Sequence, residues 1–371
     1  MKILWFTWKD SSHPQAGGAE MIGGALGRAL TAAGHEVIFL TAGYAGCKRR
    51  EYAGRCKVIR LGGRWTVYWH AYRYYRKHLR GWADVAIDEM NTMPFFARLY
   101  VKEKNVMLVH QLCREIWFYQ MFFPLDLIGY LLEPLYLRLL RKSGVITVSA
   151  STKKDLMRFG FDEDAIGIIS EALDIVPVKD IGTIPKYATP TVISLGSVRR
   201  MKRTDDIIRA FEIAKAKMPE LRLIIAGDYA NSFGRKAFRM AKLSKYAASI
   251  KFCGRITGEE KIELLQNSHI LLAASVKEGW GLVVTEAASQ GTPAVVYSVD
   301  GLRDSVRHEE TGLVCEHNSP RVMAANILDL LNDRERYERY RRSAWEWSKV
   351  MNIANCSRDF EYQVRRQVDR E

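Results

Sequence analysis

Two successive series of short apolar runs, each alternating with helical segments, constrain the fold of this chain more than any other feature. The first series begins with an expected strand at Ile3–Thr7, a helix at about residues 19–33 and a strand at Glu36–Thr41. The second begins with an expected strand at Thr191–Leu195 and a helix at Thr204–Lys217. Such alternation is typical of parallel sheets covered by helices. The sequence therefore predicts the α/β class, with two doubly wound domains facing each other across a cleft.

A proline-rich segment separates the two series. Residues 174–190 contain three prolines and lack a hydrophobic period, which favours irregular structure. A chain of 371 residues has the length of about two domains. We therefore expect a first domain at residues 1–175, a linker at residues 176–190 and a second domain at residues 191–351.

The net charge of +14 restricts the partners of the chain. Such a charge attracts nucleic acid, anionic lipid headgroups or phosphorylated substrates, and alone it does not choose between them. The six cysteines form no Cys-x-x-Cys pair, which argues against a zinc site or a disulfide framework and favours a reducing cytoplasm. The opening apolar run, Ile3–Phe6, is too short for a signal peptide.

Two segments of the first domain bear on membrane binding. Phe118–Arg141 is highly apolar, but Pro124 and Glu133 interrupt it, so we expect one or two core helices rather than a membrane-spanning helix. Arg64–Trp82 mixes aromatic and cationic side chains, as do amphipathic helices that lie in the membrane interface. It equally fits a surface helix whose aromatic side chains face the core, and both interpretations stay open at this point.

The stretch Ala274–Gly291 carries the strongest sign of chemistry. Glu286 is the only charged residue between Glu278 and Asp300, and a carboxylate in so apolar a segment needs a partner. An ionised carboxylate only accepts hydrogen bonds, which suits it to the hydroxyl groups of a sugar or a ribose. The pattern predicts a nucleotide-sugar pocket; the alternative is a structural glutamate bonded to the backbone.

Groups suited to a diphosphate follow two predicted strands of the second domain. The expected helix start at Gly281, Leu282 and Val283 offers backbone N–H groups to an anion. The loop at residues 196–203 follows the strand at Thr191–Leu195 and holds four cations within five residues. Because ligands gather at the carboxyl ends of parallel strands, both segments are expected to line one site.

The first domain contributes weaker signals. Gly17 and Gly18 precede an expected helix and would let the backbone approach a phosphate or a sugar closely, although a plain tight turn explains them as well. His110 ends an expected strand at Val106–His110, which places it for a ligand. A lone histidine is as often structural, so this alternative stays open.

Together these residues resemble the retaining glycosyltransferases of family 4, which have the GT-B fold of two Rossmann-like domains. The most specific part of the resemblance is Glu278 and Glu286 with seven residues between them. The other matching segments are Gly17–Glu20, Val109–His110, Thr147–Thr152 and Gly196–Lys202. The chain departs from the family at Ser197, where an arginine is usual, and either Arg199 or Arg200 would supply the missing guanidinium.

The resemblance implies a role for each of these residues. Glu278 would hold hydroxyl groups of the transferred sugar, and Glu286 the ribose of the nucleotide. His110 would contact the sugar near the reacting carbon and would form the catalytic set with Lys202 and Glu278. The residues implied to bind the donor are Gly17, Gly18, Arg200, Lys202, Glu278, Gly281, Leu282, Val283 and Glu286. The last helix, at about residues 352–371, is implied to pack back on the first domain.

The implied reaction transfers a sugar from a UDP- or GDP-sugar by front-face attack, with retention of anomeric configuration and with neither a metal nor a further cofactor. The acceptor would be a lipid-linked or cell-envelope glycan. The protein would be cytoplasmic, with peripheral contact to the inner face of an anionic membrane through Arg64–Trp82. The alternatives are a nucleotide-sugar epimerase or glycosyl phosphorylase on the same fold, or a non-enzymatic polyanion-binding protein. Such a protein would have no use for Glu278 and Glu286, so nucleic acid is not an expected partner.

Overall fold

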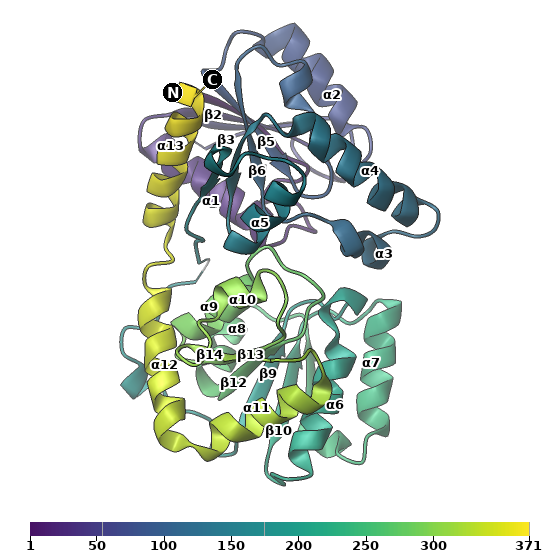
Figure 1. The fold of residues 1–371 in the computed structure, drawn as a ribbon, viewed down its shortest axis with the longest axis vertical. Helices are drawn as coiled ribbons and strands as arrows, with labels where there is room; N and C mark the ends of the chain where they lie inside the picture. The colour runs from purple at the N-terminus through teal and green to yellow at the C-terminus, as the bar shows by residue number, and fades with distance from the viewer. Residues whose placement is uncertain (54, 174, 371) are drawn as a thin grey trace. The chain divides into compact units, whose positions relative to one another are not determined.

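The computed structural model describes residues 1–53, 55–173 and 175–370, and the chain divides into two compact units. Unit 1 consists of Met1–Asp174 and Asn352–Glu371, and unit 2 consists of Ile175–Met351. Each unit is a largely parallel sheet flanked by helices (Figure 1). The doubly wound α/β architecture predicted from the alternating pattern is confirmed for both units.

The sheet of unit 1 has eight strands in the order β3-β4-β2-β1-β5-β6-β7-β8. The strands are β1 (Lys2–Phe6), β2 (Glu36–Thr41), β3 (Arg50–Ala53), β4 (Cys56–Arg60), β5 (Val85–Met90), β6 (Lys104–Val109), β7 (Gly144–Thr147) and β8 (Ile166–Ile168). Only the β3–β4 pair among them is antiparallel. The central strands are buried along their length, which is why they appear in the sequence as continuous apolar runs.

The helices of unit 1 are α1 (Gly18–Ala32), α2 (Val67–Tyr74) with a π-helical continuation at Tyr75–Leu79, α3 (Trp117–Gln120), α4 (Leu125–Leu140), α5 (Ala150–Arg158) and α13 (Ile353–Arg370). One side of α2 and its continuation is buried, with Tyr75 fully inside the core. Trp65 and Trp69, however, are 66% and 59% exposed. The aromatic side chains of this segment are therefore divided between core and surface.

Helix α4 corrects the expectation of a core helix at Phe118–Arg141. Only one of its sides is buried, and a row of leucines on the opposite side is exposed. The helix continues through Pro134, which cannot donate to the carbonyl of Tyr130. The Arg114 guanidinium donates to that carbonyl instead, at 3.2 Å. A long apolar run with helical period does not reveal whether the second side of the helix is covered.

Helix α13 returns from unit 2 to unit 1 and packs beside α1 (Figure 1, yellow against purple). The Phe360 ring stacks on Trp5 with centroids 5.1 Å apart. Gly167 permits the close approach of the helix, because a Cβ there would lie 2.2 Å from the Gln363 side chain. The Gln367 amide donates to the Ala165 carbonyl at 3.0 Å. The helix is thus an integral part of unit 1.

The sheet of unit 2 has six parallel strands in the order β11-β10-β9-β12-β13-β14. The strands are β9 (Thr191–Leu195), β10 (Arg222–Ala226), β11 (Ile250–Gly254), β12 (Ile270–Ala273), β13 (Ala294–Val296) and β14 (Gly312–Val314). The helices are α6 (Thr204–Lys215), α7 (Ser232–Leu243), α8 (Gly258–Asn267), α9 (Leu282–Ser289), α10 (Leu302–Ser305), α11 (Pro320–Asn332) and α12 (Arg334–Ser348). In this order β9, β12 and β13 are neighbours, so the loops that follow them leave the same edge of the sheet.

The segment expected to be a linker at residues 176–190 belongs to unit 2. The Lys186 ammonium donates to the carbonyls of Gln266 and Ser268, each at 2.7 Å. The Tyr187 N–H donates to the Asn267 carbonyl at 2.9 Å. Asp174, where the proline-rich segment begins, lies outside the described residues. Prolines remove backbone donors, and these hydrogen bonds attach the end of the segment to the body of unit 2.

In the described parts of the chain, no helix combines the length and the apolar content that are needed to cross a membrane.

Candidate active site

Three loops of unit 2 meet at the carboxyl edge of β9, β12 and β13. The Val276 N–H, after β12, donates to the Met201 carbonyl in the loop after β9 at 2.8 Å. The Glu278 N–H donates at 3.0 Å to the carbonyl of Asp300, which follows β13. These two hydrogen bonds connect the loops into one surface. The loop at residues 196–203 and the segment that leads to Gly281–Val283 are thus in contact, and their use as one binding site stays a prediction.

Lys202 and Glu278 form an ion pair within that surface. The Ser275 hydroxyl donates to the same carboxylate oxygen of Glu278 at 2.6 Å. The two side chains are 23% and 17% exposed, so the pair is sheltered and still reachable from solvent. Lys202 precedes Arg203, whose φ of +47° turns the backbone sharply into α6. The site therefore offers an ammonium for an anion beside a carboxylate for hydroxyl groups.

Glu286 pairs with a residue that the sequence analysis did not single out. Its carboxylate lies 2.8 Å from the Lys261 ammonium of α8, and Glu286 is almost fully buried in α9. An ammonium that neutralises a carboxylate in the absence of ligand can give way to hydroxyl donors. Lys261 stands 25 residues before Glu286, so no local pattern connects the two.

The start of α9 requires glycine. Gly281 has φ +97°, and a Cβ there would lie 2.9 Å from Leu302 and 3.0 Å from the Ser305 hydroxyl. The first N–H groups of the helix, at Leu282 and Val283, follow directly, and such groups have no intrahelical acceptor. The packing of Gly281 against α10 thus fixes the direction in which these N–H groups point.

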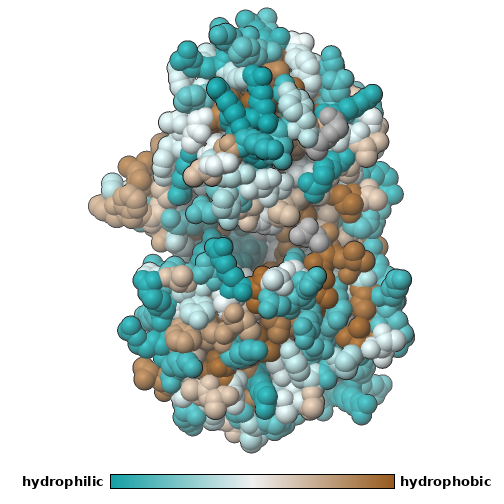
Figure 2. All heavy atoms as spheres, turned by 180° about the vertical axis from the view of Figure 1, so that it is seen from behind, coloured by the Kyte–Doolittle hydropathy of each residue, from teal (hydrophilic) through white to brown (hydrophobic). Residues whose placement is uncertain are grey.

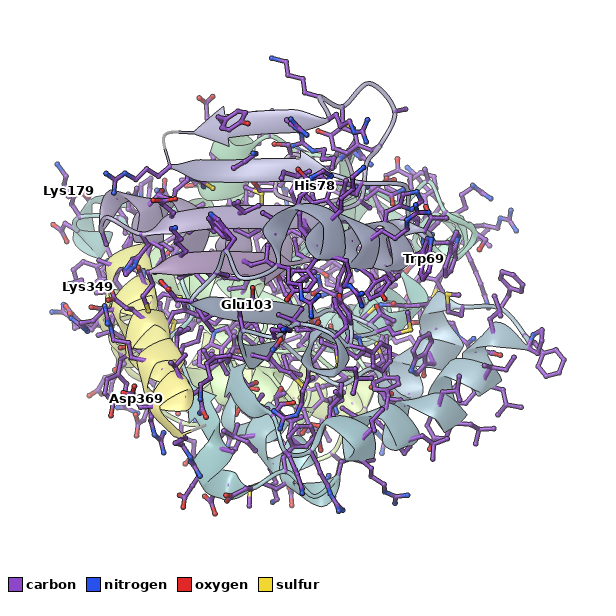
Figure 3. All side chains as sticks on the ribbon, turned by 90° about the horizontal axis from the view of Figure 1, so that it is seen from above. Trp69, His78, Glu103, Lys179, Lys349 and Asp369 are labelled. Carbon is purple, nitrogen blue, oxygen red and sulfur yellow. The ribbon has the colours of Figure 1, made fainter. Side chains whose placement is uncertain are left out.

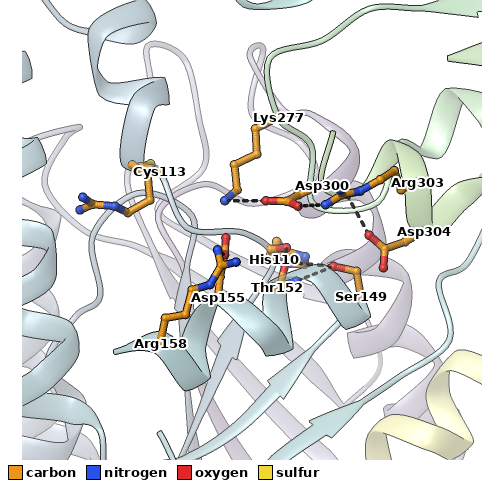
Figure 4. Close-up of polar contacts among 12 residues, drawn as sticks. His110, Cys113, Ser149, Thr152, Asp155, Arg158, Lys277, Asp300, Arg303 and Asp304 are labelled. Carbon is orange, nitrogen blue, oxygen red and sulfur yellow. Dashed lines mark hydrogen bonds and ion pairs between the residues drawn. The ribbon is translucent and has the colours of Figure 1, made fainter. Parts of the chain in front are cut away.

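A second ion pair, between Lys277 and Asp300, lies next to Glu278. The buried Lys277 ammonium lies 3.2 Å from the Asp300 carboxylate, which also pairs with Arg303 of α10 (Figure 4). Asp300 is the residue whose carbonyl accepts from Glu278. Charge and backbone contacts at one residue therefore hold Glu278 in position, and no sequence pattern predicted this support.

The structure does not choose between the two arginines proposed to replace the family arginine. Arg199 and Arg200 are both exposed, at the start of the turn that leads to Lys202. Ser197 is half-buried, 3.5 Å from the Asp228 carbonyl through its hydroxyl. Which guanidinium reaches a donor remains a prediction.

His110 lies in unit 1, directly after β6, and is buried. Its Nε2 is 3.0 Å from a carboxylate oxygen of Glu89, which also accepts from the Trp5 indole N–H at 2.7 Å. Burial lowers the pKa of His110, but the hydrogen bond and charge of Glu89, with smaller contributions from Glu171 and Glu20, raise it overall. The His110 carbonyl accepts from the Thr152 hydroxyl at 3.2 Å (Figure 4).

Glu171 is a second buried carboxylate near His110. Burial raises its pKa to about 7, against the lowering effects of the His110 charge and of the Ala172 N–H. Its Oε2 has no hydrogen-bond partner among the described residues. Neither Glu89 nor Glu171 was predicted, because Glu89 lies within a short strand and Glu171 just beyond one, and no motif marks either residue.

The Gly17–Gly18 loop of unit 1 is exposed at the entry to α1. The Gly17 N–H donates to the Glu20 carboxylate at 2.7 Å, and Lys9 pairs with Glu20 at 3.2 Å. Beside the loop lies a cavity of about 110 Å³ whose polar lining includes Ser11, Ser12, Lys9, Glu20, Arg60 and Glu89. This cavity, lined by hydrogen-bonding groups and reaching Glu89, is suited to a polar ligand.

The predicted site residues thus fall into two groups. Lys202, Glu278 and Gly281–Val283 lie around connected loops of unit 2, with Glu286 in the helix that those loops precede. His110 and Gly17–Gly18 lie in unit 1. Within the described residues, no group of three or more His, Cys, Asp or Glu side chains is arranged to hold a metal ion.

Both halves of the chain match known protein families. Residues 16–176 match "Glycosyltransferase Family 4", and residues 184–347 match "Glycosyl transferases group 1". The N-acetyl-alpha-D-glucosaminyl L-malate synthase of Bacillus anthracis is 24% identical, over 95% of this chain and 96% of that protein.

Solved structures show the same fold over the whole length. The sucrose-phosphate synthase of Thermosynechococcus elongatus has a TM-score of 0.78 at 20% identity and covers 100% of both chains. WaaG, a glycosyltransferase involved in lipopolysaccharide biosynthesis, has a TM-score of 0.74 at 16% identity, over 96% of this chain and 97% of its own. With both halves matched in the same order, the chain belongs to the glycosyltransferases of family 4 and group 1 and is an enzyme of that class with the GT-B fold.

Proposed function

We propose that this glycosyltransferase moves a sugar from a UDP- or GDP-sugar to a lipid-linked or cell-envelope glycan, with retention of anomeric configuration. The observation that carries the donor assignment is the arrangement at α9. Two carboxylates, Glu278 and Glu286, stand before and within this helix, each paired with a lysine, and the first N–H groups of the helix have no intrahelical acceptor. A nucleotide-sugar has hydroxyl groups, which carboxylates bind, and phosphates, which N–H groups at a helix start bind.

The roles follow from the chemistry of each group. Glu286 would accept hydrogen bonds from the ribose, and Glu278 from the transferred sugar. Lys202 would lie against the diphosphate, with the N–H groups of Leu282 and Val283 and the Arg200 side chain. As the bond to the sugar breaks, negative charge grows on the diphosphate, and a fixed ammonium with aligned amides stabilises it. We propose that these groups suffice without a metal or a cofactor.

Unit 1 would supply the acceptor side. His110, held by Glu89, would contact the sugar near the reacting carbon, and Gly17–Gly18 would approach the donor from this unit. The acceptor proton would pass to the leaving phosphate oxygen in a front-face reaction. WaaG acts in lipopolysaccharide biosynthesis, which supports an envelope glycan as the acceptor class. The net charge of +14 and the exposed Trp65 and Trp69 support a cytoplasmic enzyme that contacts the inner face of an anionic membrane through Arg64–Trp82.

The proposal is tested first by thermal unfolding with UDP, GDP, ADP and CMP, in EDTA. One nucleoside diphosphate is expected to raise the unfolding temperature. Lys202→Ala should reduce that rise, whereas Lys217→Ala, which changes an exposed lysine of the same unit, should leave it intact. A flat response to every nucleotide would overturn the donor assignment.

Product analysis completes the test. NMR of the anomeric proton should show the same configuration in donor and product, and an inverted product would contradict the retaining mechanism. Epimerised free nucleotide-sugar, or sugar phosphate formed from inorganic phosphate, would instead identify the alternative activities on this fold.

A further inference from the structure

The outward side of α4 and the turn before it form an exposed apolar surface on unit 1. Phe122 and Phe123, in the turn, are 71% and 75% exposed. The exposed apolar side chains of the helix are Leu125, Leu127, Ile128, Leu131, Leu132, Leu135 and Leu139. We call these nine residues the α4 apolar face. Figure 2 shows brown and pale-brown atoms on the lobe that α3 and α4 form at the side of unit 1.

The sequence spacing places these residues on one side of the helix. Ile128, Leu131, Leu132, Leu135 and Leu139 recur at intervals of three and four, the spacing of neighbours on a helical surface. The opposite side is already covered, because Gly129, Glu133, Tyr136, Leu137 and Leu140 are buried. A surface helix normally turns polar residues outward. This helix is apolar on both sides, and an exposed apolar surface of this kind usually marks an interaction site.

The hairpin of α3 and α4 is firmly attached to unit 1. Gly129 lies so close to Trp117 that a Cβ would be 2.4 Å from the indole ring. The fully buried Glu133 carboxylate accepts from the N–H groups of Cys113 and Arg114 at 2.7 and 2.6 Å. The apolar side chains are therefore presented by a fixed helix and not by a loosely packed one; Figure 3 shows side chains projecting outward along it.

Charge indicates which partner suits this surface. Arg138 is exposed on the same side of the helix, and exposed Arg141 and Lys142 follow at its end. The structure gives Arg138 and Lys142 no ion pair within the described part of the chain. Between Phe122 and Lys142 the acidic residues are the half-buried Asp126, in the first turn of the helix, and the buried Glu133, so cations prevail on the exposed side. A second copy of the same surface would add more cations without counter-charge, whereas anionic lipid headgroups would supply it.

We propose that the α4 apolar face docks on the interface of an anionic lipid bilayer. The helix would lie in the plane of the interface along about 18 Å, from Leu127 to Leu139. Its leucines and the aromatic turn would enter the acyl boundary, and Arg138 and Lys142 would contact headgroup phosphates. The inference deepens the proposed function, on which it rests for the membrane-held acceptor. It adds a second and longer contact to the one proposed at Arg64–Trp82, where Val67, Ala71, Tyr75 and Leu79 are turned into the core.

The test is co-sedimentation of the full chain with vesicles of phosphatidylglycerol and phosphatidylcholine in equal parts. The variant with Leu131→Gln, Leu135→Gln and Leu139→Gln removes three side chains that are each 58% exposed. Its vesicle affinity should fall at least about tenfold, because each leucine contributes buried apolar area. A matched triple control, Val176→Gln, Leu243→Gln and Val350→Gln, changes exposed apolar residues elsewhere and should bind as the parent does.

Two further arms identify the partner. Arg138→Gln with Lys142→Gln should weaken binding to anionic vesicles by about tenfold while leaving weak binding to pure phosphatidylcholine unchanged. The exposed control pair Arg334→Gln and Arg342→Gln should have no effect. Light scattering of the leucine variant should match that of the parent. If the variant instead loses a dimer that the parent forms, or if it sediments with vesicles like the parent, the proposal is overturned.

Failure of this inference is distinguishable from failure of the proposed function. The nucleotide-dependent rise in unfolding temperature reports on unit 2 and should be the same in the leucine variant and in the parent. A parent that binds vesicles through α4 and responds to no nucleotide would retain the docking surface and lose the donor assignment. A parent that responds to a nucleotide but does not bind vesicles would retain the donor assignment and lose the docking surface.

Discussion

The polar groups of the two units are held in different ways. In unit 1, Glu89 lies inside β5, is buried, and is bonded to Trp5 of β1 and to His110 after β6. In unit 2, Glu278 and Glu286 stand on a loop and a short helix, and each is neutralised by a flexible lysine. The first arrangement is part of the core of unit 1. In the second, as proposed, a ligand would replace the lysine beside each carboxylate.

This difference between the units indicates where a mutation at a polar site will also change the stability of the fold. A buried carboxylate with two donors on neighbouring strands cannot be removed without leaving those donors unsatisfied. The Lys202–Glu278 ion pair is partly exposed, so it contributes little to folding and is free to serve recognition. Mutations in unit 1 are therefore expected to affect both stability and turnover, and those in unit 2 mainly donor affinity.

The largest effect is expected from Glu89→Ala. Loss of this carboxylate leaves the Trp5 and His110 donors buried without an acceptor, and should lower the free energy of unfolding by about 3 kcal/mol. Turnover should be lost with it, whereas the nucleotide-dependent shift in unfolding temperature should persist, because that site belongs to unit 2. Urea denaturation, a transfer assay and the thermal shift measure the three quantities.

Glu51→Ala serves as the control for that experiment. Glu51 is a carboxylate of the same sheet, paired with Arg60 but about half exposed, so its loss should cost at most about 1 kcal/mol. If Glu89→Ala costs no more than Glu51→Ala, or if it abolishes nucleotide binding, the two units do not differ as described.

A smaller, pH-dependent effect is expected from Glu171→Gln. Burial raises the pKa of Glu171 to about 7, so the folded protein holds its proton where the unfolded chain has released it. The stability of the parent should therefore fall relative to the variant from about pH 5 to pH 7. Above pH 7 the variant should be more stable by on the order of 2 kcal/mol.

Urea denaturation at pH 5, 6, 7 and 8 measures this difference. His110 adds to the same trend in both proteins, because its raised pKa gives stability below its unfolded pKa that is lost as the pH rises through the folded value. Stability curves that run parallel across the range would show that Glu171 ionises normally in the folded protein.

The smallest change in free energy is expected from Glu286→Gln. An amide accepts from hydroxyl groups less strongly than a carboxylate and also leaves Lys261 without a counter-charge, so affinity for the nucleoside diphosphate should fall about tenfold, or about 1.4 kcal/mol. Isothermal titration calorimetry gives the affinity, with Glu263→Gln, an exposed carboxylate of α8, as control. Unchanged affinity in Glu286→Gln would remove Glu286 from the donor site.

Sequence alone predicted the strands well where they are buried. The strands at Glu36–Thr41 and Thr191–Leu195 lie where expected, because a buried parallel strand must be apolar throughout. Glu286 stood out for the same reason, as one charge in an apolar helix. Lys261 and Glu89 did not, since their partners are distant in the chain and only the packing of α8 on α9, or of β5 beside β6, brings them together.

Helix α4 shows what an apolar pattern cannot predict, which is whether both sides of a helix are covered. An apolar helical run predicts that the chain avoids water there, and this holds equally for a core and for a surface that meets another apolar phase. The segment Arg64–Trp82 was the expected membrane contact because it combines aromatics with cations. In the structure its inner side, with Tyr75, fills the core of unit 1. Only the packing of neighbouring elements distinguishes a helix side that is buried in the core from one that is exposed.

The position of α13 sets an order of events during synthesis. The ribosome delivers all of unit 2 before it delivers Ile353–Arg370, so unit 1, although made first, is completed last. Until then Trp5 lacks its stacking partner Phe360, and the side of the sheet near His110 stays uncovered. If unit 2 holds the donor and unit 1 the acceptor, as proposed, the donor unit is complete before the acceptor unit during synthesis. Sugar transfer would then wait for Ile353–Arg370.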